Sequence, residues 1–118
     1  MTKNRRLANE IRDWLLDHDM WVDTVIYFDG VAYAPWDEDM KHFFYNDPTH
    51  LIEYEADPAK CLEYYNRDTV TMTFEGPLYL VINDSEQPRL KDEFDAIFKK
   101  YGFYYEQGYA WSLSCYKL

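Results

Sequence analysis

Residues 20–34 read MWVDTVIYFDGVAYA, and this stretch decides the fold. Two runs of β-branched and aromatic residues, 20–28 and 31–34, flank the dipeptide Asp29-Gly30. Asp-Gly between two such runs is a strong signal for a β-hairpin, because a type I′ turn needs positive φ at both central residues. The chain is therefore expected to build an antiparallel sheet around this hairpin.

Further stretches after the hairpin predict strands that can join it. Residues 69–74 alternate strictly, with apolar side chains on one face and threonines on the other. Residues 51–55 are typical of an edge strand, because acidic residues separate Ile52 from Tyr54. Residues 103–105 and 109–116 predict a second hairpin across Gln107-Gly108. The side chains expected on one face of its last strand are Tyr109, Trp111, Leu113 and Cys115.

Residues 3–18 and 88–101 predict two amphipathic helices, because apolar side chains recur on one helical face in each. Thr2 or Asn4 is expected to cap the first helix, and Gly102 suits the position just after the second. Asp57-Pro58 predicts the start of a short helix through residue 65. The apolar run inside residues 77–83 fits a buried strand or a short helix equally well.

These elements together predict one α+β domain over residues 1–118, since no linker or repeat divides the chain. We expect an antiparallel sheet of four to six strands with two main helices packed on one face. The other face of the sheet is expected to be open and to carry exposed tyrosines and acids.

Charge is the most distinctive feature of the composition. The 118 residues carry a formal net charge of −10, with 22 acidic and 12 basic side chains. Residues 13–88 alone hold −14, whereas residues 1–12 hold +3 and residues 89–118 hold +1. An acidic surface repels nucleic acid and anionic membranes and attracts basic proteins or cations. It can also serve only to keep a protein soluble, and the sequence does not separate these two roles.

Motifs of the common enzyme classes are missing. There is no GxGxxG or GxxxxGK[ST] phosphate cradle, no GxSxG elbow and no CxxC pair. We therefore assign no catalytic residue and no cofactor, and expect Cys61 and Cys115 to be free thiols. No apolar run approaches 18 residues, and charges interrupt the N-terminal segment, so a cytoplasmic protein without a membrane contact is expected.

One set of residues offers metal-ligand chemistry. His42 and His50 lie in an acidic segment, and imidazole with carboxylate suits zinc, manganese or iron. A small metal-dependent hydrolase built on these two histidines is therefore an alternative hypothesis. The acids near them are Asp37, Glu38, Asp39 and Asp47. Glu53 and Glu55 would lie about 6.7 Å apart on one strand face, a separation that glycosidases use, although edge strands also carry charge to prevent association.

The leading hypothesis is a non-enzymatic protein that engages a basic protein partner through acidic and aromatic residues, without binding nucleic acid itself. A mimic of DNA that inhibits a host defence enzyme is its sharpest form, and an immunity protein for a basic toxin is a close alternative. A homodimer that pairs through the open sheet face is a further hypothesis. The residues expected to contact the partner are Trp36, Asp37, Glu38, Asp39, Asp47, Glu53 and Glu55.

Residues 74–79 (FEGPLY) and 100–113 (KYGFYYEQGYAWSL) resemble small acidic proteins of conjugative elements and phages in Gram-positive bacteria. Residues 9–21 resemble the same group, so the resembling segments are spread between residues 9 and 113. It implies no activity and no catalytic residues. It does imply a context, since such elements often encode inhibitors of host restriction or other defences.

Overall fold

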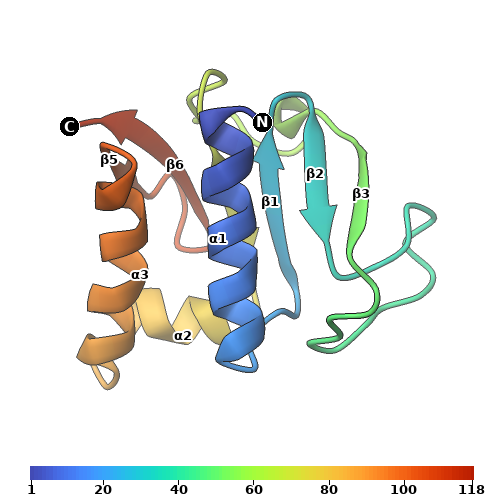
Figure 1. Ribbon diagram of the computed structural model, residues 1–118, viewed down its shortest axis with the longest axis horizontal. Helices are drawn as coiled ribbons and strands as arrows, with labels where there is room; N and C mark the ends of the chain where they lie inside the picture. Colours follow the sequence, from blue (N-terminus) through green and yellow to red (C-terminus); the bar gives the residue numbers. More distant parts are fainter.

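The computed structural model describes residues 1–118 and has an α+β fold with a six-stranded sheet (Figure 1). The strand order is β3-β2-β1-β4-β6-β5, and every neighbouring pair is antiparallel, as predicted. In chain order the elements are α1 (Lys3–Asp17), β1 (Thr24–Phe28), β2 (Val31–Ala34), β3 (Ile52–Glu55), the 3-10 turn η1 (Pro58–Lys60), β4 (Thr71–Phe74), α2 (Pro77–Asn83), α3 (Pro88–Lys100), β5 (Phe103–Glu106) and β6 (Ser112–Lys117).

The central hairpin forms as its sequence predicts. Asp29 and Gly30 have φ of 50° and 80°, the pair of left-handed conformations that a type I′ turn requires. Strand β1 starts at Thr24 rather than at residue 20. The reason is local, because Asp19 and Asp23 also adopt positive φ (59° and 47°) and so interrupt an extended backbone.

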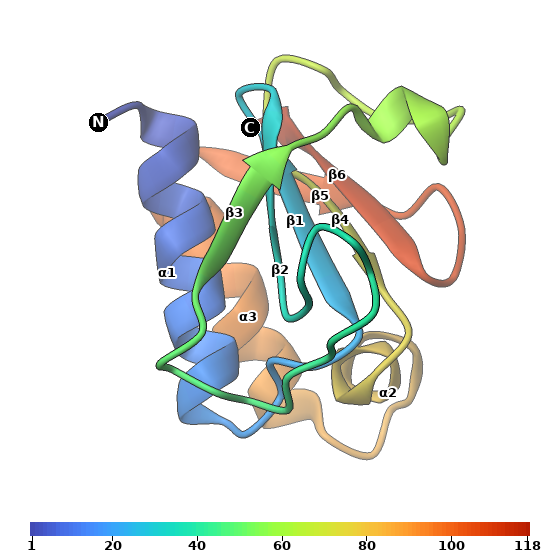
Figure 2. The ribbon, with the colours of Figure 1, turned by 90° about the vertical axis from the view of Figure 1, so that its right-hand side faces the viewer.

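Helices α1 and α3 cover one face of the sheet, which confirms the predicted arrangement (Figure 2). Thr2 caps α1, with its hydroxyl oxygen accepting from the backbone N–H of Arg5 at 3.0 Å. Helix α3 ends before Gly102, whose φ of 83° stops the helix. The apolar faces of the two helices are buried at Leu7, Ala8, Ile11, Leu15, Phe94, Ile97 and Phe98. None of the helices is long and apolar enough to cross a membrane.

The second face of the sheet is not open, which corrects one expectation. The segment between β3 and β4 crosses it and buries Leu62. Polar side chains beneath are satisfied internally: the hydroxyls of Thr71 and Ser114 lie 2.8 Å apart, and the N–H of Asn66 donates to Ser114 Oγ at 2.7 Å. Threonine and serine side chains point to this face, and polar side chains at alternating strand positions favour a solvent-exposed face when the sequence is considered alone.

Two local predictions were wrong and one ambiguity is settled. Only the η1 turn forms after Asp57, and residues 61–65 are irregular rather than helical. Strand β6 starts at Ser112, so Tyr109 and Trp111 lie in the preceding loop, stacked 4.9 Å apart at 6°. Because the two rings pack against each other in the loop, neither needs a position in the strand. Residues 77–83 form a helix.

Gly76 brings two distant segments into close contact. A Cβ on Gly76 would lie 2.5 Å from the carbonyl oxygen of Val22, nearer than real Cβ atoms come. Immediately before it, the N–H of Glu75 donates to the carbonyl of Asp23 at 2.9 Å. The lack of a side chain at position 76 therefore lets the start of α2 pack against the chain that leads into β1.

We predict that Gly76→Ala lowers the free energy of unfolding by about 1–3 kcal/mol, because the added methyl group meets backbone rather than a movable side chain. Denaturant unfolding measures the change. Gly30→Asn is the control, since nothing lies within 4 Å of a Cβ there and Asn tolerates positive φ. Equal stability of wild type and Gly76→Ala would show that this junction is not tightly packed.

Candidate functional site: an acidic surface

The first predicted partner-binding residues lie in the excursion between β2 and β3. Trp36 forms an isolated bridge with Phe43, and the two rings lie 5.7 Å apart. This pairing folds the excursion back on itself, and the N–H of Asp37 donates to the carbonyl of His42 at 2.9 Å. Trp36 is half-buried by these contacts, so it anchors the loop as well as facing solvent.

The same fold-back gathers part of the predicted metal-ligating set. Ligand atoms of Asp37, Asp39 and His42 all lie within 4.8 Å of one another, and His42 Nδ1 is 3.2 Å from Asp37 Oδ2. Asp39 and His42 are exposed. His50 is not a member of this group, because its Nδ1 lies 2.8 Å from Asp47 Oδ2. The structure therefore does not join His42 and His50 in one cluster.

Asp47 is held in a tight polar turn. Its carboxylate accepts from the hydroxyl and the N–H of Thr49 at 2.6 and 2.9 Å and pairs with His50. These hydrogen bonds, those of Thr49 first, hold the pKa of Asp47 at about 2. The ring of His50 stacks on Phe44 at 4.2 Å. Asp47 is thus a structural acceptor in its own loop.

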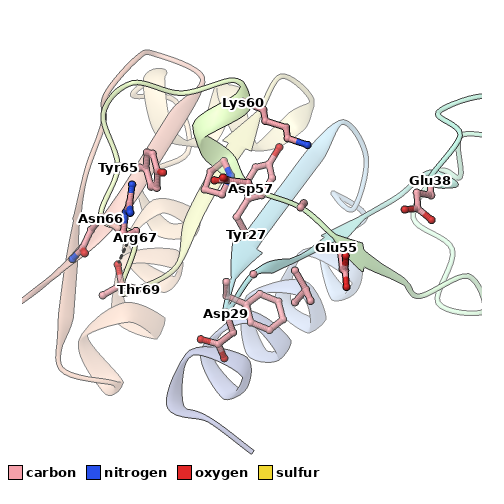
Figure 3. A pocket seen from close by; sticks show the side chains of 15 residues that line it. Tyr27, Asp29, Glu38, Glu55, Asp57, Lys60, Tyr65, Asn66, Arg67 and Thr69 are labelled. Carbon is pink, nitrogen blue, oxygen red and sulfur yellow. Dashed lines mark hydrogen bonds between the residues drawn. The ribbon is translucent and has the colours of Figure 1, made fainter.

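Glu53 and Glu55 share one face of β3, as the alternation predicts, but their surroundings differ. Glu53 pairs with Arg5 of α1, with Oε1 2.5 Å from the guanidinium, and this bond raises the pKa of Arg5. Glu55 has no ion-pair partner and faces a hollow on the neighbouring surface (Figure 3). A matched pair of catalytic carboxylates is therefore not formed here, because one of the two is bound to arginine.

That hollow has a volume of about 760 Å³ and lies at the end of the sheet with the β1–β2 turn (Figure 3). Its charged lining residues carry both signs: Asp29, Glu38, Glu55, Asp57, Lys60 and Arg67. At its floor Tyr27 lies 3.6 Å from the thiol of Cys61, and burial first, then this contact, raises the pKa of Tyr27. Four carboxylates and two cations therefore line the hollow, so its charge is of mixed sign.

Charge of a single sign lies elsewhere, in two segments that the fold brings together. Residues 13–23 and 75–87 hold seven acidic residues and no lysine or arginine. They meet through the contact of Glu75 with Asp23 and form the end of the molecule where α1 stops and α2 lies (Figure 1). We call this the acidic end; its exposed carboxylates are Asp13, Asp17, Asp19, Asp23, Glu75, Asp84 and Glu86.

Sequence reasoning missed the acidic end as a unit, because its two halves are far apart along the chain. A signal was present, since no basic residue occurs between Arg12 and Lys41 or between Arg67 and Arg89. The hydrogen bond between Glu75 and Asp23 and the packing at Gly76 show that these two stretches share one surface.

Charges on α1 oppose the helix dipole. The first turn of the helix carries Lys3, Arg5 and Arg6, its last turn carries Asp17, and Asp13 lies one turn earlier, next to Arg12. A helix is stabilised by the reverse arrangement, typically by about 0.3–1 kcal/mol for each charge. The two aspartates also lack an ion-pair partner in the structure. Their placement therefore does not serve the stability of the helix.

Comparison with protein-family models, with curated proteins and with solved structures found no match to this chain. The resemblance to small acidic proteins of conjugative elements and phages therefore stays a prediction, and the residues themselves carry the functional argument.

We predict that Thr49→Ala raises the pKa of Asp47 from about 2 toward its ordinary value, because the largest hydrogen bond to the carboxylate is lost. A lowered pKa stabilises the fold above about pH 4, and this contribution disappears as pH falls toward 2. The carboxyl ¹³C shift of Asp47 followed through a pH titration measures the change. Thr49→Ser keeps the hydroxyl and should keep the low pKa; an unchanged pKa in Thr49→Ala would contradict the assigned cause.

Proposed function

We propose that this protein is a non-enzymatic binding protein that engages a basic protein partner through its acidic end. The observation that carries the proposal is the convergence of seven exposed carboxylates from two segments that contain no lysine or arginine. A concentrated field of one sign speeds the encounter with a partner of opposite charge and selects against like-charged ones.

The position of the charge favours binding over a role in solubility alone. Solubility needs net charge, which acids anywhere on the surface supply. Asp13 and Asp17 instead lie toward the negative end of the α1 dipole, where a carboxylate is least favourable. Residues that weaken the fold where they stand are typical of functional sites.

The chemistry of the acidic end fits a partner whose own surface binds phosphate. A mimic of DNA that inhibits a defence enzyme and an immunity protein for a basic toxin both meet this description, since carboxylates would replace phosphates in either complex. Competition separates the two forms. A mimic is displaced by duplex DNA from its target, whereas an immunity protein need not cover the surface that binds nucleic acid.

A metal-dependent hydrolase has less support. The grouping of Asp37, Asp39 and His42 favours it, but His50 is engaged with Asp47 and Thr49 and lies outside that group. Three ligands on one loop, two of them exposed, also leave the hydrolytic water without a positioned base.

The proposal predicts capture of a basic protein from a lysate of the source organism by the immobilised chain. Retention should fall steeply between about 0.1 and 1 M salt, because the Debye length shortens from about 10 to 3 Å. The triple variant Asp17→Asn/Asp84→Asn/Glu86→Gln should lose retention, with bound proteins identified by mass spectrometry.

The matched control removes the same three charges from the first predicted surface, as Glu38→Gln/Asp39→Asn/Glu55→Gln. It should retain the partner nearly as well as wild type. Loss in the control but not in the acidic-end variant would move the contact to the first predicted surface. Retention that ignores salt, or an empty capture, would contradict the proposed function.

A further inference from the structure

A groove of about 360 Å³ lies within the acidic end, between the C-terminal end of α1, the excursion between β2 and β3, and the α2–α3 corner. Its volume is at the low end of the range of about 300–1,000 Å³ seen for small-ligand sites. The residues that line it are His18, Asp19, Met20, Tyr45, Pro77, Leu80, Asp84, Glu86, Gln87 and Leu90.

Exposed apolar side chains form part of the groove wall. Leu80 is 58% exposed, although its neighbours Leu78, Val81 and Ile82 in α2 are all buried. Tyr45 is 63% exposed. Large apolar side chains gathered at a charged surface are typical of protein contact sites, since they gain most from being covered.

Tyr45 is positioned by its neighbour Asn46 rather than left on a free loop. The side-chain oxygen of Asn46 accepts from the N–H of Trp21 at 2.9 Å, and the N–H of Asn46 donates to the Trp21 carbonyl at 2.9 Å. The amide of Asn46 also donates to the carbonyl of Leu16 at 3.0 Å. This wall of the groove is therefore formed before any partner arrives.

The charged rim carries one sign. Asp19, Asp84 and Glu86 line the groove, and no lysine or arginine does. His18 also lines the groove; its Nδ1 lies 2.8 Å from the Trp14 carbonyl, and its Nε2 lies 3.9 Å from Glu93. A groove with an apolar wall and an acidic rim is complementary to an apolar side chain flanked by cations.

We infer that this groove is the docking site for a segment of the basic partner that inserts an apolar side chain between Tyr45 and Leu80 and places lysines or arginines against the rim. The inference rests on the proposed function and specifies how the acidic end recognises its partner. Carboxylates continue beyond the groove at Asp17, Asp23 and Glu75, farther than a small ligand would use. That extension favours a polypeptide.

Two synthetic peptides of equal length and charge test this inference: KKLKKLKK, and KKAKKAKK with alanine in place of leucine. Each is titrated into the ¹⁵N-labelled protein, and the affinity and the shifted amides are read together. The leucine peptide should bind about tenfold more tightly, because the extra apolar surface that leucine buries contributes about 1.4 kcal/mol to the binding free energy. It should shift amides at Asp19, Leu80 and Glu86.

Leu80→Ala and Tyr45→Ala should each remove most of the difference between the peptides, and both positions are exposed enough to leave the fold intact. Tyr64→Ala is the matched control, because Tyr64 is 64% exposed outside the groove. Equal binding of both peptides at the acidic end overturns the groove but leaves the proposed function standing. Shifts confined to residues 36–43 and 47–55 overturn the groove, and binding of neither peptide overturns both proposals.

Discussion

The structure depends on the burial of the apolar face of α1 between the sheet and α3. Leu7, Ile11 and Leu15 are fully buried there, and each removes a large apolar side chain from water. This contact holds in place a helix whose own charges oppose its dipole. Because packing rather than local electrostatics stabilises α1, its C-terminal end is free to carry carboxylates that a less firmly packed helix would tolerate poorly.

Because of that contact, the two ends of the molecule differ in the sign of their charge. Helix α1 stops at the end where α2 packs, and α3 starts there, so the acids of residues 13–23 and 75–87 gather on one surface (Figure 1). At the other end lie the lysines and arginines that begin α1 and end α3. The contact at Gly76 joins the two acidic segments, and the groove between them supplies apolar surface within a field of negative charge.

Much of the fold could be predicted from local patterns. The Asp29-Gly30 turn and the apolar faces of α1 and α3 follow from conformational preference and periodicity, which act over a few residues. Failures came where tertiary contact overrides local pattern. Thr71 lies on the sheet face that was expected to be open, but its hydroxyl hydrogen-bonds to Ser114 beneath a loop. The apolar alternation that includes Trp111 begins before the true start of β6.

The acidic character of the candidate site could be predicted from the sequence, but its position on the surface could not. Net negative charge over residues 13–88 indicates an acidic surface, yet it does not show which carboxylates are already engaged. Asp47 and Glu53 are bound by Thr49 and Arg5, contacts that depend on loop and helix geometry. The acidic end required the meeting of Asp23 with Glu75, which no local pattern reports.

The central claim is that the carboxylates of the acidic end occupy positions that favour partner binding and lower the stability of the fold. Thermal unfolding of Asp13→Asn/Asp17→Asn at low salt tests it most directly, beside Glu63→Gln/Asp68→Asn, which removes the same charge from a loop. The account predicts that the α1 variant raises Tm by about 2 °C or more, and by more than the loop variant, because the unfavourable dipole interaction of Asp17 and the like-charge i,i+4 pair of Asp13 with Asp17 disappear. A lower Tm in the α1 variant would show that these aspartates stabilise the fold and would contradict the account.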